Sequence, residues 1–172
     1  MQNEMKTLAE QIATTKFLVV DDEHSMRKVI RALLTTMGAQ TIYEAKNGSA
    51  GLDLIGTLAP HIVILDWEMP RVDGAAFMRA VRSPGKFSHP NVPVIMLTGH
   101  SERSRVVEAA QLGINEYLVK PVSLNALQKR LTAVLTNPRP MVRNGDYYGP
   151  APRKLSAVIN DADPLTEYFL VD

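Results

Sequence analysis

The chain contains no cysteine, only one tryptophan and no long apolar run. The absence of cysteine excludes disulfides and catalysis by a thiol. No apolar stretch approaches the roughly 20 residues that a membrane-spanning helix needs, and residues 1–6 lack the basic start and apolar core of a signal peptide. The chain also has no excess of charge, since it contains 19 basic and 18 acidic residues. This balance gives no indication of nucleic acid or an anionic membrane as partner. We therefore expect a cytoplasmic protein.

What is present is ordinary for one globular domain with appendages. The chain has 172 residues, of which 45% are hydrophobic and 22% charged. Five short apolar runs alternate with patterns of helical period, and the runs cover residues 16–20, 41–45, 61–65, 93–97 and 116–119. We expect the intervening helices to start near Ser25, Ser49, Ala75 and Ser101, and a last helix to follow Ser123. This alternation predicts an α/β fold, a parallel sheet with helices on both faces.

Polar side chains stand where these predicted strands end. Asp21 and Asp22 follow the first strand, Asp66 the third, Thr98 the fourth and Lys120 the fifth. Because the carboxyl ends of parallel strands share one edge, we expect these five side chains to converge. Each also has a simpler interpretation: helix caps for the acids, turns for Asp66 and Thr98, a solvated side chain for Lys120. Adjacent carboxylates repel one another, however, which favours a bound cation.

This set of side chains suits phosphoryl transfer to Asp66. A carboxylate can act as the nucleophile, and the protein then contributes mainly positioning and neutralisation of charge. A hard cation such as Mg²⁺ takes oxygen ligands and would neutralise the acids and the phosphoryl oxygens. Lys120 adds a second positive charge, and Thr98 a hydroxyl donor.

The chain resembles the bacterial two-component response-regulator receiver domains of the stand-alone, CheY-like type. The resemblance covers roughly residues 15–136 and rests on four motifs: residues 17–22 (FLVVDD), 64–70 (ILDWEMP, with Asp73 and Gly74 after it), 94–99 (VIMLTG) and 117–121 (YLVKP). It implies a doubly wound, five-stranded parallel sheet of order 2-1-3-4-5, a flavodoxin/CheY-like fold. It divides the chain into an extension with a short helix at 1–15, the receiver domain at 16–136 and a tail at 137–172.

The resemblance also implies a metal site around the phosphoacceptor Asp66. Asp22 would contact Mg²⁺ directly and Asp21 through water, and the backbone carbonyl of Glu68 would be the remaining protein ligand. Lys120 matches the phosphate-binding lysine of the family, and its bond to Pro121 is expected to be cis.

Thr98 matches the switch hydroxyl of the family, and Tyr117 matches the aromatic residue that turns inward when Thr98 moves. The phosphoryl group would come from a sensor histidine kinase or a histidine phosphotransfer protein. The response would change contacts with a downstream protein at the face of helix 101–113, strand 116–119 and helix 124–135. On that helix Arg103 and Glu108 are candidate contacts. No turnover is expected beyond Mg²⁺-dependent autophosphorylation from a phosphodonor and autodephosphorylation.

Glu68 and His100, two residues after Asp66 and Thr98, flank the expected phosphoryl position. We hypothesise that they set its lifetime by controlling access of water; the alternative is two solvated side chains. Two other functions remain open for the whole chain. One is an adaptor of receiver fold that needs no phosphorylation. The other is a phosphatase of the haloacid-dehalogenase type, although that chemistry requires a second Asp where this chain has Glu68.

The two ends of the chain add less specific signals. Met5, Leu8 and Ile12 form a weak helical stripe, which suits a frayed leader or a short docking helix. The tail from 137 is too short for an independent domain without metal or disulfides. Its apolar groups at Tyr147 and Tyr148, and at 155–159 and 168–171, predict packing on its own domain or on a second copy in a homodimer.

Overall fold

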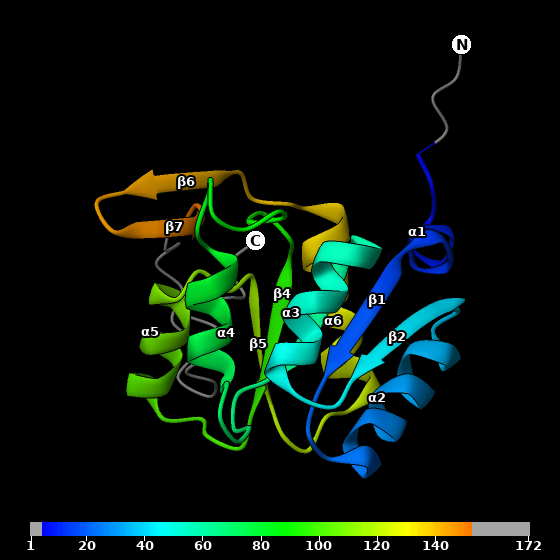
Figure 1. Ribbon diagram of the computed structural model, residues 1–172. Coiled ribbons are helices and arrows are strands. Elements are labelled where there is room, and N and C mark those ends of the chain that lie inside the picture. The colour runs from blue at the N-terminus through cyan, green and yellow to red at the C-terminus, as the bar shows by residue number, and fades with distance from the viewer. Residues whose placement is uncertain (1–4, 153–172) are drawn as a thin grey trace.

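The computed structural model describes residues 5–152, and their centre is a parallel sheet (Figure 1). Its strands are β1 (Lys16–Val20), β2 (Thr41–Ala45), β3 (Ile62–Asp66), β4 (Val94–Thr98) and β5 (Glu116–Val119), in the order β2-β1-β3-β4-β5. All four pairings are parallel. The predicted fold class and strand order are confirmed.

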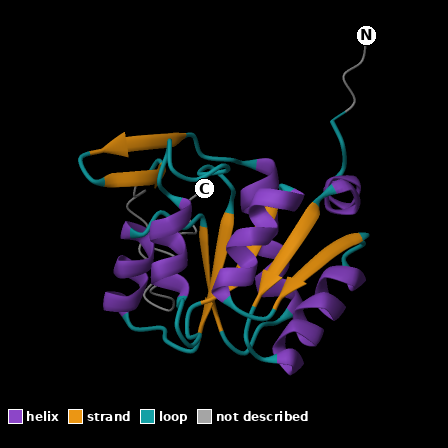
Figure 2. Cartoon of the chain, in the orientation of Figure 1, coloured by secondary structure: helices purple, strands orange, loops and turns teal. Residues whose placement is uncertain are grey.

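Helices cover both faces of the sheet (Figures 1 and 2). The helices are α1 (Leu8–Thr14), α2 (His24–Thr36), α3 (Gly48–Leu58), α4 (Gly74–Val81), α5 (Arg103–Gln111) and α6 (Leu124–Thr136). One apolar cluster joins α3, α4 and α5 to one face, and a second joins α1, α2 and α6 to the other. Alternation within β1 shows the division, because Leu18 lies in the first cluster and Phe17 and Val19 in the second.

Local sequence explains most helix boundaries. Asn47, Asp73 and Ser123 are N-caps of α3, α4 and α6, and each side chain accepts a hydrogen bond from a backbone N–H three residues later. Four predicted starts were wrong by one or two residues, since α4 begins at Gly74 and not at Ala75, and α5 begins at Arg103 and not near Ser101. Helix α2 begins at His24, before Ser25, and α3 begins at Gly48, before Ser49, because Asn47 provides the cap.

A hairpin follows α6 in the chain. Strands β6 (Met141–Asn144) and β7 (Tyr147–Pro150) pair in antiparallel fashion and form a separate two-stranded sheet. The tail residues 155–159 and 168–171, for which packing was predicted, lie outside the described residues. Within residues 5–152, no helix has the length and apolar character that crossing a membrane requires.

Candidate functional site

Three carboxylates meet at the carboxyl edge of the sheet. Asp21 directly follows β1, and Asp66 is the last residue of β3; both are buried, whereas Asp22 is exposed. One oxygen from each of the three lies within 4.8 Å of the others. Strands β1 and β3 are neighbours in the sheet, so the topology itself brings Asp21 to Asp66.

Lys120 reaches the same cluster from the end of β5. Its Nζ donates a hydrogen bond to Asp66 Oδ1 at 2.9 Å and lies 3.7 Å from Asp21 Oδ2. The peptide bond from Lys120 to Pro121 is cis. Burial acts to lower the pKa of the ammonium, but the hydrogen bond and charge of Asp66, with the charge of Asp21, outweigh it and raise that pKa. Lys120 therefore stays charged beside the carboxylates.

Burial nevertheless disfavours the ionised forms of Asp21 and Asp66. Burial raises the pKa of Asp66 from 3.8 to about 6, although the bond from Lys120 opposes the rise. Burial also raises the pKa of Asp21, against the opposing backbone hydrogen bond from Glu23. Asp21 Oδ2 is buried without a hydrogen-bond partner among the described residues. A buried carboxylate oxygen that accepts no hydrogen bond, beside two further carboxylates, is a donor set that a hard divalent cation fits.

A second group surrounds Thr98 at the end of β4. Asp66 lies opposite Leu97 in the sheet, so Thr98 is close to the acid cluster along the same edge. The Thr98 hydroxyl accepts a hydrogen bond from the His100 backbone N–H at 3.1 Å. It also donates a long one, at 3.5 Å, to Glu68 Oε1. The buried Tyr117 donates from its hydroxyl to the His100 carbonyl oxygen at 2.5 Å.

His100 connects the segments on either side of this group. Its Nε2 lies 3.2 Å from Glu68 Oε1, and its Nδ1 lies 3.4 Å from Glu102 Oε1. Glu68 and His100 therefore form one polar contact that joins the loop after Asp66 to the loop after Thr98. The structure thus gathers the predicted residues into two adjacent groups, acids with Lys120 and Thr98 with Tyr117, which His100 and Glu68 border.

Two residues that contact the site, Glu102 and Arg105, were not predicted from the sequence. Glu102 is the second acidic partner of His100, and its spacing of two residues could have indicated it. Arg105 of α5 places its guanidinium carbon 4.8 Å from the centroid of the Trp67 ring, a cation–π distance. No local signal links these two positions, because they belong to different βα units. Trp67 is buried and adjoins Asp66, so its fluorescence can report changes at the site.

Comparison with known proteins places this geometry in a family context. The model of the family described as response regulator receiver domain matches residues 17–132. The chain is 34% identical over 119 residues to the chemotaxis protein CheY of Pseudomonas aeruginosa, which covers 69% of this chain and 94% of that protein. It is 34% identical over 121 residues to CheY1 of Helicobacter pylori, covering 70% of this chain and 96% of that protein.

Solved structures of receiver proteins are similar to this chain as well. Chemotaxis protein CheY4 of Vibrio cholerae superposes with a TM-score of 0.64 at 30% identity, covering 72% of this chain and all of that one. The receiver domain of the Francisella response regulator 1452 superposes with a TM-score of 0.65 at 28% identity, covering 72% and 98%. The family model ends at residue 132, so residues 133–172 lie outside the region that it matches.

Proposed function

Because the chain belongs to the response regulator receiver family, we propose that it accepts a phosphoryl group on Asp66 in a two-component or phosphorelay pathway. The observation that supports this most is the position of Lys120. Its ammonium bonds one oxygen of Asp66, and Asp66 lies in a cluster of three carboxylates. A nucleophilic carboxylate beside a cation is the arrangement that phosphoryl transfer requires.

In the proposed reaction, a carboxylate oxygen of Asp66 attacks the phosphorus of a phosphohistidine. The new P–O bond replaces the P–N bond, and the imidazole leaves with the electron pair and takes up a proton. The product on Asp66 is an acyl phosphate, and attack by water on its phosphorus returns the carboxylate and inorganic phosphate. Lys120 holds the carboxylate in place and then faces the phosphoryl oxygens, and the Thr98 hydroxyl is the nearby neutral donor.

Asp21, Asp22 and Asp66 would hold Mg²⁺, together with the backbone carbonyl of Glu68. Bound Mg²⁺ would neutralise the negative charge of the carboxylates and the phosphoryl group. The raised pKa values of Asp21 and Asp66 support this assignment, as does the Asp21 Oδ2 atom, which is buried without a hydrogen bond among the described residues.

The switch would operate through Thr98, His100 and Tyr117. A phosphoryl group adds charge and acceptor oxygens at Asp66, so the Thr98 hydroxyl gains an acceptor that competes with Glu68 for its proton, and a shift of Thr98 moves the oxygen that accepts from the His100 N–H. Because Tyr117 is bonded to the His100 carbonyl, a shift of this loop alters the environment of Tyr117. The face formed by α5, β5 and α6 would then change shape, and a downstream protein would prefer one of the two shapes. The phosphodonor would be a sensor kinase or a phosphotransfer protein.

The test is fluorescence of Trp67 in the full-length chain. We expect Mg²⁺ to change the emission, and beryllofluoride, a phosphoryl mimic, to change it again. The Asp66→Asn variant should lose the response to beryllofluoride and should not form an acid-labile phosphate adduct with acetyl phosphate.

Asp53→Asn provides the matched control, because Asp53 is exposed on α3. It should behave like the unaltered chain. Absence of any response to beryllofluoride in the unaltered chain would instead favour an adaptor that works without phosphorylation. Turnover of phosphate esters would favour the phosphatase alternative.

A further inference from the structure

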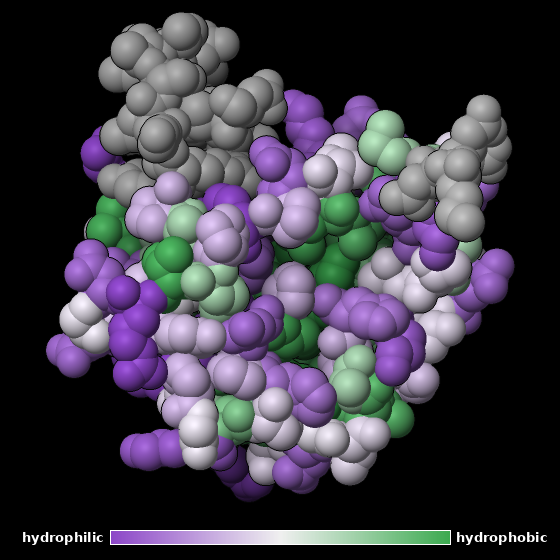
Figure 3. Space-filling model, turned by 90° about the horizontal axis from the view of Figure 1, so that it is seen from above, coloured by the Kyte–Doolittle hydropathy of each residue, from purple (hydrophilic) through white to green (hydrophobic). Residues whose placement is uncertain are grey.

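The β6–β7 hairpin lies at the end of the sheet opposite to the acid cluster (Figure 1). It comes after the region that the family shares, which ends at residue 132. Figure 3 views the molecule from the hairpin side, and polar residues dominate this face, with apolar ones in small patches. The contacts that hold the hairpin on the domain lie beneath this surface, where Gly149 and Pro150 are buried.

A tight contact joins the hairpin backbone to Gly113, just after α5. Gly113 follows the C-cap of α5 with φ +84°, and a Cβ there would lie 2.6 Å from the Tyr148 carbonyl oxygen. A Cβ on Gly149 would lie 2.7 Å from the Gly113 Cα and 2.5 Å from the Tyr147 hydroxyl oxygen. Two glycines thus allow two backbones to touch, and no larger residue fits at either position without a shift.

Arg82 also holds this segment, through hydrogen bonds from its guanidinium group. It is 8% exposed, and its guanidinium donates to the Gly113 carbonyl at 2.9 Å and to the Asn115 Oδ1 at 3.0 Å. It also donates to the carbonyls of Pro90 and Val92 at 2.7 and 2.8 Å. Burial lowers the pKa of Arg82 to about 10, so the side chain remains charged at neutral pH. Charge-assisted bonds of this kind are among the stronger ones in proteins.

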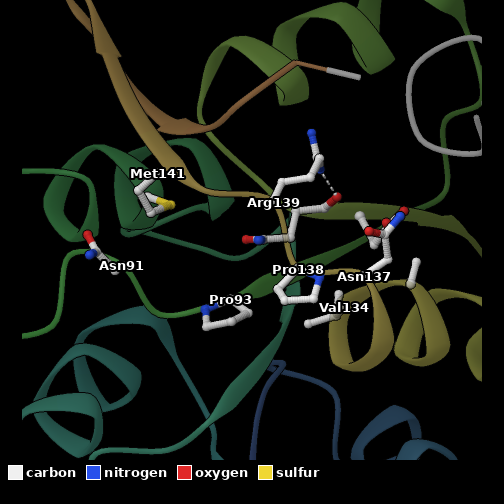
Figure 4. A pocket seen from close by; sticks show the side chains of 10 residues that line it. Asn91, Pro93, Val134, Asn137, Pro138, Arg139 and Met141 are labelled. Atoms are coloured by element: carbon white, nitrogen blue, oxygen red, sulfur yellow. Dashed lines mark hydrogen bonds between the residues drawn. The ribbon is translucent and has the colours of Figure 1, made fainter. Parts of the chain in front are cut away.

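The base of the hairpin adds polar contacts. Arg139 donates to the Asn115 carbonyl at 2.6 Å and to the Ala151 carbonyl at 2.9 Å, and the Tyr148 hydroxyl donates to Asn91 Oδ1 at 2.5 Å. A cavity of about 180 Å³ lies beside Arg139, between the end of α6 and the start of β5 (Figure 4). Packing is therefore incomplete here, and the segment 113–115 is held by the glycine contact, Arg82 and Arg139.

The start of α5 differs from its end in exposure and in the residues that it contacts. Residues 99–104 are exposed, and the N-cap residue Glu102 makes no side-chain capping bond. Two contacts at this end run to the loop that follows Asp66, from His100 to Glu68 and from Arg105 to Trp67. The C-terminal end of α5 thus contacts the hairpin, and its N-terminal end contacts the loop that follows Asp66.

We propose that the β6–β7 hairpin is an intramolecular anchor that fixes the C-terminal end of α5, so that phosphorylation moves the start of this helix about Gly113. The second half of this statement rests on the proposed function. The anchor itself does not rest on the proposed function, because the contacts between the hairpin and the end of α5 are formed without a phosphoryl group. The hairpin would act as a positioning element that limits which part of the face formed by α5, β5 and α6 changes shape for a partner.

The test is amide hydrogen exchange in the full-length chain with Gly149→Ala, whose new methyl group displaces the hairpin from Gly113. Without Mg²⁺ or mimic, we expect exchange at Leu112, Gly113 and Asn115 to become about tenfold faster, because local opening becomes easier. Within α5 and the loop before it, Mg²⁺ and beryllofluoride should change exchange in the unaltered chain only at residues 99–107. In Gly149→Ala the change should extend through the end of α5.

Gly56→Ala is the matched control, since the nearest atom to its Cβ, Ser88 Oγ, is 3.8 Å away. It should leave both patterns unchanged. If Gly149→Ala fails to fold, Tyr148→Phe removes only the bond to Asn91 and should accelerate exchange in the same segment by a smaller factor. Unchanged exchange at Leu112–Asn115 in these variants would overturn the anchor. If beryllofluoride already changes exchange along all of α5 in the unaltered chain, the proposed movement about Gly113 is wrong. Absence of a Trp67 fluorescence change with beryllofluoride would contradict the proposed function alone.

Discussion

The carboxyl group of Asp66 experiences two opposing effects. Burial disfavours its ionised form, whereas the hydrogen bond from Lys120 and its charge favour it, and burial prevails because the pKa rises from 3.8 to about 6. Asp21 is raised in the same direction. At neutral pH the protein without metal therefore carries ionised carboxylates in an environment that disfavours them. This makes the site receptive to a cation and costs stability in its absence.

This cost predicts that Asp66→Asn stabilises the protein without metal. Between pH 3.8 and about 6 the folded state keeps a proton that the unfolded state has released, so stability falls as pH rises through this window and stays lower above it. Asn remains neutral and avoids the loss. We expect a gain of about 1–3 kcal/mol at pH 7, since one pKa unit corresponds to about 1.4 kcal/mol and solvent screening reduces the full value.

Denaturant unfolding in EDTA measures this difference. The gain should shrink toward zero near pH 4, where the carboxyl of the unaltered chain is protonated in the folded state. Saturating Mg²⁺ at pH 7 should also reduce it, because only the unaltered site binds the ion fully. A gain that stays constant from pH 4 to pH 7 would show that the titration of Asp66 is not its cause.

The contact between Glu68 and His100 leads to a prediction about phosphoryl lifetime. Both side chains flank the proposed phosphoryl position and lie 3.2 Å apart. If together they restrict water, Glu68→Ala and His100→Ala should each change the rate of dephosphorylation several-fold, and the double variant should change it no more than the larger single one. Decay of acid-labile phosphate after removal of acetyl phosphate measures the rates. Unchanged rates in both single variants would leave them as solvated surface groups.

At the scale of elements, the loop between β3 and α4 depends on close packing at Gly74. Gly74 donates its N–H to the Trp67 carbonyl at 2.7 Å. A Cβ at this position would lie 2.8 Å from Trp67 Cα and 2.9 Å from Met96 Sδ. The helix α4 therefore starts directly against the backbone that carries Asp66 and Trp67, and the position of the acceptor depends on how closely α4 approaches.

Gly74→Ala should accordingly disturb both stability and the site. We expect a loss of about 1–3 kcal/mol from overpacking, together with a weaker response of Trp67 fluorescence to Mg²⁺. Gly56→Ala in α3 is the control and should be neutral or slightly stabilising, by up to about 1 kcal/mol, because Ala is the better helix former. An Mg²⁺ response equal to that of the unaltered chain would show that the loop tolerates the shift.

At the scale of the whole molecule, the described extensions at both ends pack on the receiver fold. Helix α1 starts with a capping box between Thr7 and Glu10 and buries Ile12, which is 2% exposed, in the cluster that α2 and α6 share. The hairpin packs at the amino end of β5 and the C-terminal end of α5. Residues on both sides of the family region thus contribute to one structure.

Ile12→Ala should therefore behave as a core substitution. We expect it to lower the free energy of unfolding by about 2–4 kcal/mol, because a buried side chain is replaced by a cavity. Met5→Ala provides the control within the same extension, since Met5 is 94% exposed, and it should have no measurable effect. Urea unfolding of both variants checks this, and equal stabilities would mean that α1 is only loosely attached.

The sequence alone determined the sheet, the order of its elements and the residues of the acid cluster. This was possible because an apolar run such as residues 62–65 has to be buried on both faces, and a parallel sheet places the ends of such strands together. Boundaries were less certain where capping residues compete. Asn47 and Ser49 could both start a helix, and which of them does so depends on the backbone around it.

Only the tertiary structure decided the contacts between distant segments. The bond from Tyr117 to the His100 carbonyl, the stacking of Arg105 on Trp67 and the meeting of Gly113 with Gly149 each join positions from different elements. A local pattern describes which face of a strand or helix is buried, but it carries no information about which distant residue lies opposite. That depends on how whole layers pack together, and so the anchor at the end of α5 was visible only in the folded chain.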